Sequence, residues 1–150
     1  MPRFEFRLKT LLAVREAARD LARTQLAELL AQQDSLSRRR AHLEREVNDQ
    51  KQWLRRGTAP GRIDVDRLST ANRYELVLGR EISTIMRHEQ TLTPEIEGRR
   101  QAVVEADREV RVLEKLRERQ FEQFRQQRAL AEVKQLDEVA ARAMDRHEPA

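Results

Sequence analysis

Cysteine, glycine, proline and aromatic residues are all scarce in this chain of 150 residues. It contains no Cys, four Gly and four Pro, and aromatic side chains make up 4% of it. Without Cys the chain cannot form a disulfide scaffold, a thiolate metal site or a Cys nucleophile. So few Gly and Pro residues cannot supply the turns of a β-sandwich or barrel. No apolar run approaches the ~18–20 residues of a membrane-spanning helix, and residues 1–10 lack the apolar region of a signal peptide. We therefore expect a soluble chain that does not follow the ordinary export route.

Charged residues are abundant instead. They make up 37% of the chain, against the ~25% that is usual, which is typical of long solvated helices. The net charge is +4, but basic and acidic residues are interleaved. Residues 1–60 carry 13 basic and 8 acidic residues, whereas residues 61–110 carry 8 and 10. The densest basic cluster, residues 38–40, has Asp34 and Glu44 within one or two turns. This pattern favours salt-bridged helix surfaces over nucleic-acid binding, for which base-stacking aromatics are also lacking.

One stretch reads as a strong break between two helices. Two glycines and a proline lie within residues 57–61, which ends a helix and turns the chain. Behind the break, Asp64 can cap the next helix and Asp66 falls in its first turn, with Ile63 and Leu68 placed for a hydrophobic staple. We predict a helix over about 4–56, a turn over about 57–63 and a second helix over about 64–145.

Both helices carry heptad repeats. Upstream, Leu29, Leu36 and Leu43 repeat at seven, with Val47 and Leu54 on the alternate positions. Earlier apolar residues keep the same steps in a shifted phase, which predicts a stutter near Gln25: Leu11, Val14, Ala18 and Leu21. Downstream, one phase is kept throughout: Leu68, Ala71, Leu78, Ile82, Ile85, Leu92, Ile96, Val103, Ala106, Val110 and Leu113.

The predicted fold class is therefore all-α, a single domain over residues 1–150 that forms a long antiparallel two-helix coiled-coil hairpin. A short loop cannot return a parallel partner. The second helix is the longer one, and Pro94 either kinks it or breaks it to give three helices. Pairing outward from the loop sets Phe4 opposite roughly Leu116. Apolar residues beyond that point have no partner within the chain: Phe121, Phe124, Leu130, Val133, Leu136, Val139 and Met144.

The sequence offers no catalytic chemistry. A two-helix hairpin has no interior that could enclose a substrate, and no Gly-rich phosphate loop is present. The histidines His42, His88 and His147 are isolated, without the spacing of a metal-ligand motif. We therefore predict no enzymatic activity, no cofactor and no metal.

The two ends of the chain carry its most specific patterns. Residues 4–16 read Phe-Glu-Phe-Arg-Leu-Lys-Thr-Leu-Leu-Ala-Val-Arg-Glu, residues 113–116 read Leu-Glu-Lys-Leu and residues 136–138 read Leu-Asp-Glu. Around a central Gly/Pro turn, these patterns in this order resemble the FliJ family of bacterial flagellar export proteins. The resemblance spans the whole chain, but only the ends match recognisably.

The resemblance implies a component of the flagellar type III export apparatus in the cytoplasm, at the cytoplasmic face of the cell membrane and held there through partners. Those partners are the hexameric export ATPase, the cytoplasmic domain of the export gate and the export chaperones. By analogy with a rotor coiled coil, nine residues are expected to face the ATPase: Phe4, Phe6, Leu8, Leu11, Leu12, Arg15, Leu136, Asp137 and Glu138. Leu8, Leu11 and Leu12 have an alternative role, closing the coiled coil against Leu113 and Leu116.

The tip of the hairpin holds the only Trp and Tyr of the chain. Trp53 and Tyr74 flank the seam, and Val77 lies one turn from Tyr74. We expect these three residues to dock the export gate, although the two aromatic rings could instead stiffen the tip. Three other functions remain open: a related rod of virulence type III secretion, a generic structural coiled coil, and a basic binder of nucleic acid or membrane surfaces.

Overall fold

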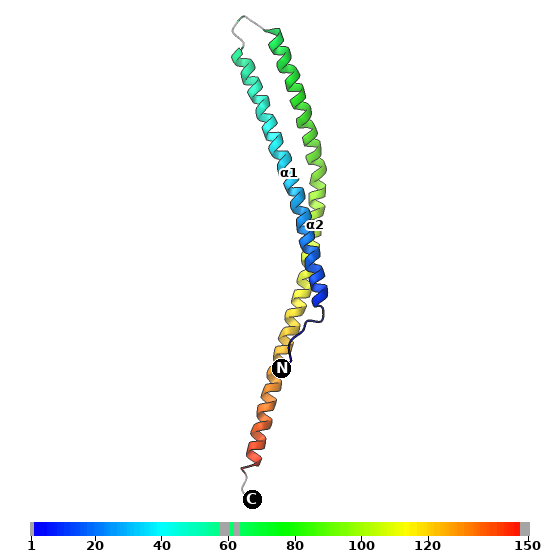
Figure 1. Ribbon diagram of the computed structural model, residues 1–150, viewed down its shortest axis with the longest axis vertical. Helices are drawn as coiled ribbons and strands as arrows, with labels where there is room; N and C mark the ends of the chain where they lie inside the picture. Colours follow the sequence, from blue (N-terminus) through cyan, green and yellow to red (C-terminus); the bar gives the residue numbers. More distant parts are fainter. Residues whose placement is uncertain (1, 58–60, 62–63, 148–150) are drawn as a thin grey trace. The chain divides into compact units, whose positions relative to one another are not determined.

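The computed structural model describes residues 2–57, 61 and 64–147, and in this part of the chain it contains two helices and no strand (Figure 1). Helix α1 spans Lys9–Gly57 and helix α2 spans Val65–Asp145, with 49 and 81 residues respectively. Residues of α1 pack against residues of α2, and the sequence separation of these pairs grows away from the loop, from Tyr74–Glu46 to Arg15–Glu109. The prediction of an all-α antiparallel hairpin with a longer second helix is confirmed.

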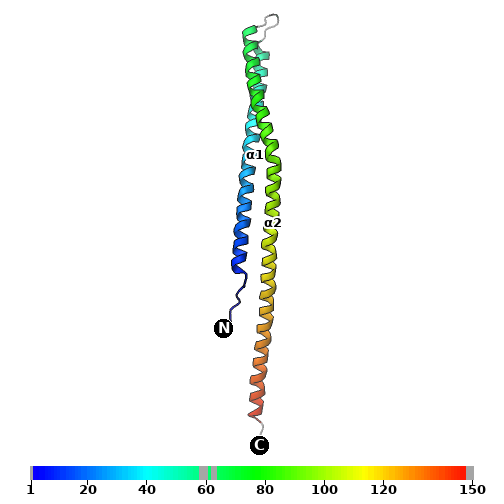
Figure 2. The ribbon, with the colours of Figure 1, turned by 90° about the vertical axis from the view of Figure 1, so that its right-hand side faces the viewer.

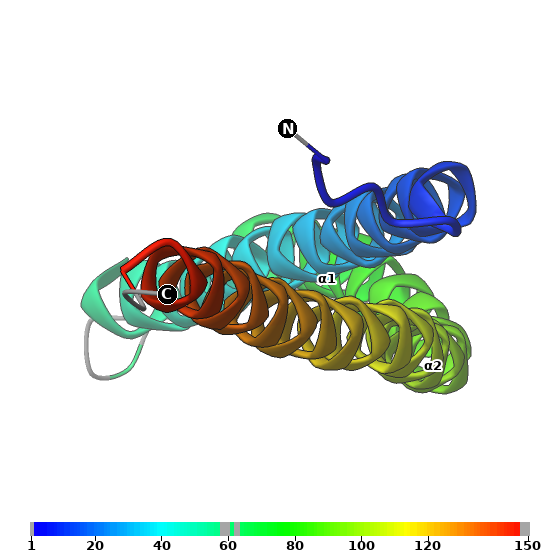
Figure 3. The ribbon, with the colours of Figure 1, turned by 90° about the horizontal axis from the view of Figure 1, so that it is seen from below.

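The start of α1 differs from the prediction. The helix begins at Lys9 and not near residue 4, and residues 2–6 have no regular secondary structure. Seen from below in Figure 3, this segment leaves the first turn of α1 as an irregular trace. No Ser, Thr, Asp or Asn precedes Lys9, so no side chain can cap an earlier helix start. The Lys9 amide instead donates to the Phe6 carbonyl at 3.1 Å, and the helix starts behind that turn.

The beginning of α2 agrees with the sequence. The Arg67 amide donates to Asp64 Oδ1 at 3.2 Å, which is the predicted N-cap, and Asp66 lies in the first turn. In the connection, Gly61 has a φ of 97°, a left-handed conformation that glycine adopts without strain. Pro60 and Ile63 lie outside the described residues. The hydrophobic staple expected between Ile63 and Leu68 therefore lies outside them as well.

The seam of α1 keeps one heptad phase over the whole helix. Every residue at two heptad positions is buried or half-buried: 8, 15, 22, 29, 36, 43 and 50 in one row, and 12, 19, 26, 33, 40, 47 and 54 in the other. The predicted stutter near Gln25 is therefore wrong. The shifted apolar residues Leu11, Val14, Ala18 and Leu21 lie on the exposed flank of the helix. Polar side chains such as Arg19 and Gln33 occupy the seam in their place, because the apolar body of a long side chain can cover a coiled-coil seam.

The chain forms two compact units, and each takes one part of both helices. The tip unit comprises residues 21–103 and the terminal unit comprises residues 1–20 with 104–150. Figure 2 shows the two helices from the side. The core of the tip unit is built from Leu43, Leu78 and Ile85. The core of the terminal unit contains Phe6, Leu12, Val110 and Leu113. That the whole chain is one domain stays a prediction.

Helix α2 continues through Pro94 without interruption, so the alternative with three helices is wrong. A proline inside a helix removes one main-chain hydrogen bond and crowds the preceding turn, at a cost of roughly 3 kcal/mol. Leu92 and Ile96, on either side of Pro94, are only 3% and 5% exposed. Their burial at consecutive seam positions offsets that cost and holds the two halves of α2 in one phase.

Candidate partner-binding sites

Trp53 and Tyr74 lie together on one side of the tip unit. Each directly precedes a seam position, Leu54 in α1 and Glu75 in α2, and in an antiparallel pair such positions share one face. The two rings line a shallow hollow of about 490 Å³ together with Asp49, Gln50, Thr70 and Ala71. Trp53 is 46% exposed and Tyr74 is 40% exposed. The structure therefore brings together the two aromatic residues that the sequence singled out.

Val77 lies on the same flank of α2, one turn beyond Tyr74, and is 51% exposed. It directly precedes the seam residue Leu78, just as Tyr74 precedes Glu75. Val77 does not line the hollow between the two rings. The three residues thus form one exposed apolar surface, here called the tip surface: Trp53, Tyr74 and Val77.

Arg67 holds Trp53 in place, a role that the sequence did not indicate. Its guanidinium lies over the indole ring, 3.6 Å from the centroid, and donates from Nη2 to the Trp53 carbonyl oxygen at 3.0 Å. This carbonyl is in the last turn of α1, where main-chain acceptors lack helical partners and attract cations. A Cβ on Gly57 would overlap the guanidinium, so glycine at the end of α1 leaves room for this contact. Cation–π contacts cannot be found from spacing alone, which is why Arg67 was missed.

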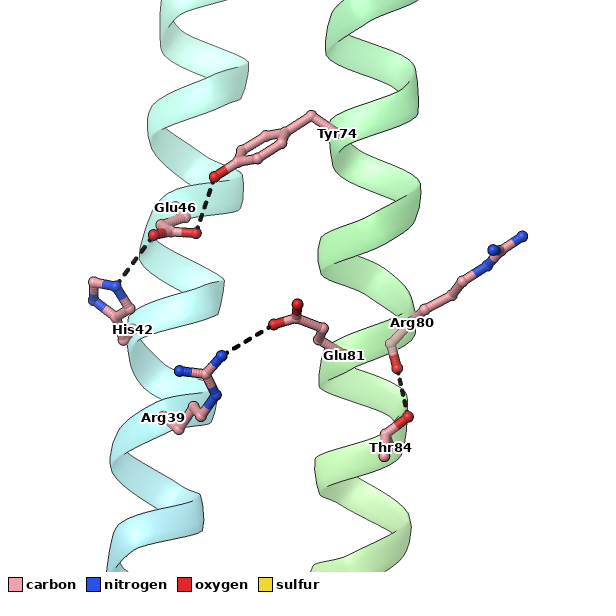
Figure 4. Close-up of polar contacts among 7 residues, drawn as sticks. All are labelled: Arg39, His42, Glu46, Tyr74, Arg80, Glu81 and Thr84. Carbon is pink, nitrogen blue, oxygen red and sulfur yellow. Dashed lines mark hydrogen bonds and ion pairs between the residues drawn. The ribbon is translucent and has the colours of Figure 1, made fainter.

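Tyr74 is tied to α1 through Glu46 (Figure 4). Its hydroxyl donates to Glu46 Oε2 at 3.2 Å, and the other oxygen of Glu46 lies 3.1 Å from His42 Nε2. One turn away, Arg39 pairs with Glu81 across the helices at 3.4 Å. The negative charge of Glu46 raises the pKa of Tyr74 above its ordinary value of 10.0, and burial adds to the shift. The aromatic ring is therefore anchored at its hydroxyl while its face stays exposed.

This contact predicts a change in the titration of Tyr74. Replacing Glu46→Gln removes the charge that disfavours the phenolate, so the pKa of Tyr74 should fall back towards 10.0. Ultraviolet absorbance measures this pKa directly, because Tyr74 is the only tyrosine in the chain. Glu44→Gln, two residues away on an exposed part of α1, is the matched control and should leave the titration unchanged. An equal response to both substitutions would contradict the contact.

At the terminal unit, several residues expected to face the ATPase pack inside the chain. Phe6 is 8% exposed and Leu12 is 5% exposed, both in contact with the core around Val110. Phe4 and Leu8 are half-buried against the same core. Leu8 and Leu12 thus pack against α2, which is the arrangement that the alternative role, closing the coiled coil, requires. The side chains of these four residues stabilise the terminal unit in this arrangement.

Phe4 reaches further along α2 than the pairing predicted. Its ring packs edge-on against Phe121 at a centroid distance of 5.3 Å and lies 5.7 Å from Phe124. It was expected opposite Leu116, on the assumption of a helix rising ~1.5 Å per residue. An extended segment rises ~3.3 Å per residue, so residues 2–6 carry Phe4 beyond that point. Phe121 and Phe124 therefore have a partner within the chain, contrary to the prediction.

Of the other expected ATPase-facing residues, all but the half-buried Arg15 are exposed. Leu11 is 39% exposed on the flank of α1, and Leu136 is 69% exposed on α2, followed by the exposed Asp137 and Glu138. Arg15 occupies a seam position, where its Nη1 lies 2.8 Å from Glu109 Oε2. Other apolar side chains near the end of α2 are exposed as well: Leu130, Val133, Val139 and Met144. These residues leave a surface of the terminal unit available to a partner.

The basic cluster of residues 38–40 is neutralised by neighbouring carboxylates. Arg38 pairs with Asp34 at 3.0 Å, Arg39 with Glu81 at 3.4 Å and Arg40 with Glu89 at 3.3 Å. Arg40 and Glu89 both occupy seam positions, so this pair also helps to fix the register of the two helices. The carboxylates offset the positive charge of the cluster, which supports the interpretation of a salt-bridged surface.

The described part of the chain contains no group of three or more His, Cys, Asp or Glu side chains that could hold a metal ion. Among these residues, no helix carries a stretch long and apolar enough to cross a membrane. The hollows are shallow surface features, and the tip surface offers aromatic and aliphatic contacts with no converging nucleophile or base.

The fold defines a class of protein: a two-helix coiled-coil hairpin. A family model described as Flagellar FliJ protein matches residues 4–149, nearly the whole chain. The chain belongs to the FliJ family and is a component of the flagellar protein export apparatus. No curated protein and no solved structure matches it.

Proposed function

We propose that this protein is a non-enzymatic hairpin that links the hexameric flagellar export ATPase to the cytoplasmic domain of the export gate and receives export chaperones. In this proposal it works in the cytoplasm at the inner face of the cell membrane, where its partners hold it. The tip surface docks the gate. The exposed residues of the terminal unit, Leu11 and residues 136–138, contact the ATPase, and Phe4, Phe6, Leu8, Leu12 and Arg15 shape that end of the hairpin.

The observation that carries the proposal is the tip surface of a chain that belongs to the FliJ family. Binding energy at protein interfaces concentrates in a few aromatic anchors, and Trp and Tyr are the most frequent of them. The chain has one of each, and both are half-exposed on the same face of the tip unit. Their rotamers are restrained beforehand, Trp53 by Arg67 and Tyr74 by Glu46, which lowers the entropy lost on binding.

Three other functions are less well supported. A rod of virulence type III secretion would share the fold, but the family match is to the flagellar protein. A generic structural coiled coil would not need aromatic residues held half-exposed at the tip. A binder of phosphate is disfavoured because the densest basic cluster is paired with carboxylates.

The ATPase contact is tested with a triple substitution, Leu136→Ala, Asp137→Asn and Glu138→Gln. These side chains are exposed and lie away from the core around Val110, so helicity should be retained. We expect the variant to lose most of its stimulation of ATP hydrolysis by the purified hexameric export ATPase, because the substitutions remove an exposed apolar side chain and two charges from the proposed contact surface.

The matched control is Leu130→Ala, which removes a Leu of similar exposure, 70%, from the same helix. It should stimulate the ATPase as the unmodified chain does. If the triple variant stimulates the ATPase fully, and circular dichroism shows unchanged helicity, residues 136–138 do not contact the ATPase.

A further inference from the structure

Three arginines form a row on the outer face of α2 in the tip unit. Arg73, Arg80 and Arg87 are seven residues apart, which is two helical turns or about 10.5 Å between neighbours. The seam residues Leu78 and Ile85 face α1, and at ~100° per residue the row falls on the opposite side of the helix. Figure 4 shows the Arg80 side chain extending away from α1. The row is therefore separate from the tip surface, which flanks the seam.

The guanidiniums of this row have no carboxylate partner among the described residues. Arg87 makes one long contact, from Nε to the Ser83 carbonyl oxygen at 3.5 Å. Elsewhere in the tip unit, Arg39 and Arg40 pair with glutamates across the seam. A guanidinium carries five N–H donors and no acceptor, so the row presents unused donors in a regular array.

A hollow and an exposed aliphatic side chain accompany the row. The hollow, about 920 Å³, is lined by Asn72, Glu75, Leu76, Gly79, Arg80, Ser83, Thr84 and Arg87. Leu76 is 63% exposed. A Cβ at Gly79 would meet nothing within 4 Å, so packing inside the chain does not require glycine there. The surface thus combines charge, apolar side chains and room for close approach, as protein interfaces do.

We propose that this outer face of α2 docks an acidic amphipathic helix of a protein partner, with carboxylates two turns apart that pair with Arg73, Arg80 and Arg87. An Arg and a carboxylate form a bidentate, charge-assisted pair. The occupant is a protein helix because its carboxylates can repeat at the same interval as the arginines and its apolar side chains can cover Leu76. Nucleic acid fits poorly, since residues 61–110 carry 8 basic and 10 acidic residues and the row has no aromatic side chain for stacking.

The test uses the full chain and two synthetic helical peptides. One peptide carries three Glu residues seven apart with Leu between them, and the other carries Gln in place of each Glu. At low salt we expect the chain to bind the Glu peptide about tenfold more tightly than the Gln peptide, which is the combined effect of three exposed ion pairs. The triple variant Arg73→Gln, Arg80→Gln and Arg87→Gln should lose this preference.

The matched control replaces three other exposed arginines, Arg45→Gln, Arg100→Gln and Arg119→Gln, and should keep the tenfold preference. Equal binding of both peptides by the unmodified chain would overturn the proposal, and so would an equal loss in the two triple variants. Displacement of the Glu peptide by oligothymidylate at matched charge would overturn it as well, by making the row a general polyanion surface. The Trp53 and Tyr74 contacts are untouched by these variants, so the result is independent of gate docking.

Discussion

Replacing Val110→Asp should lower the free energy of unfolding by at least ~3 kcal/mol. Val110 is the one described side chain that is large and fully buried, at 0% exposed, and it packs with Phe6, Leu12 and Leu113 in the core of the terminal unit. An aspartate there loses the apolar contacts and places a carboxylate where no cation or donor meets it. Urea unfolding followed by circular dichroism measures the change.

Val112→Asp is the matched control, because Val112 lies two residues away on the same helix and is 61% exposed. Exposed substitutions of this kind usually change stability by less than ~0.5 kcal/mol. Similar losses in the two variants would mean that the burial of Val110 against the N-terminal segment does not hold in solution.

Much of the fold could be predicted from the sequence because its signals are local or periodic. The heptad phase of α2 predicted its seam, including the buried Leu78, Leu92 and Ile96. The Gly and Pro residues around position 60 predicted the turn, and Asp64 predicted the cap of α2. The same periodicity placed Trp53 and Tyr74 beside the seam, where the structure has them.

Other features of the structure could not be predicted, because the sequence allows more than one packing and does not show which is the more stable. In α1, two sets of apolar residues could have formed the seam. Leu11 and Val14 belong to one heptad phase, and Leu8 and Leu12 belong to the other. The structure buries the second set, whose phase continues through Leu29 and Leu43. The irregular N-terminal segment contains no capping residue and is positioned by the packing of Phe4 and Phe6 on α2. The Arg67–Trp53 contact joins two helices across the turn, and no spacing rule predicts such a pair.

The double substitution Trp53→Ala and Tyr74→Ala should weaken binding to the cytoplasmic domain of the export gate by about 2 kcal/mol or more, roughly thirtyfold in Kd. Both side chains are half-exposed anchors of the tip surface, and neither belongs to the core of Leu43, Leu78 and Ile85. Calorimetric titration of the purified gate domain with the full chain measures the loss, and circular dichroism checks that helicity is kept.

Arg67→Ala is the informative companion, since it removes the cation from the indole ring and keeps both aromatic side chains. It should weaken gate binding far less than the double substitution, because the contact surface itself remains. If the double variant binds the gate with undiminished affinity, the aromatic residues stiffen the tip and the gate is bound elsewhere. A loss that Arg67→Ala reproduces in full would mean that the shape of the tip, and not its aromatic surface, decides binding.

A role in flagellar export is tested most directly by the amount of flagellar filament and hook subunits that cells secrete into the medium when they lack this chain. We expect secretion to fall steeply without the chain, while the subunits remain present inside the cell. The unmodified chain should restore secretion, and the Trp53→Ala, Tyr74→Ala variant should restore it only weakly. Full secretion by cells that lack the chain would contradict its role in flagellar export.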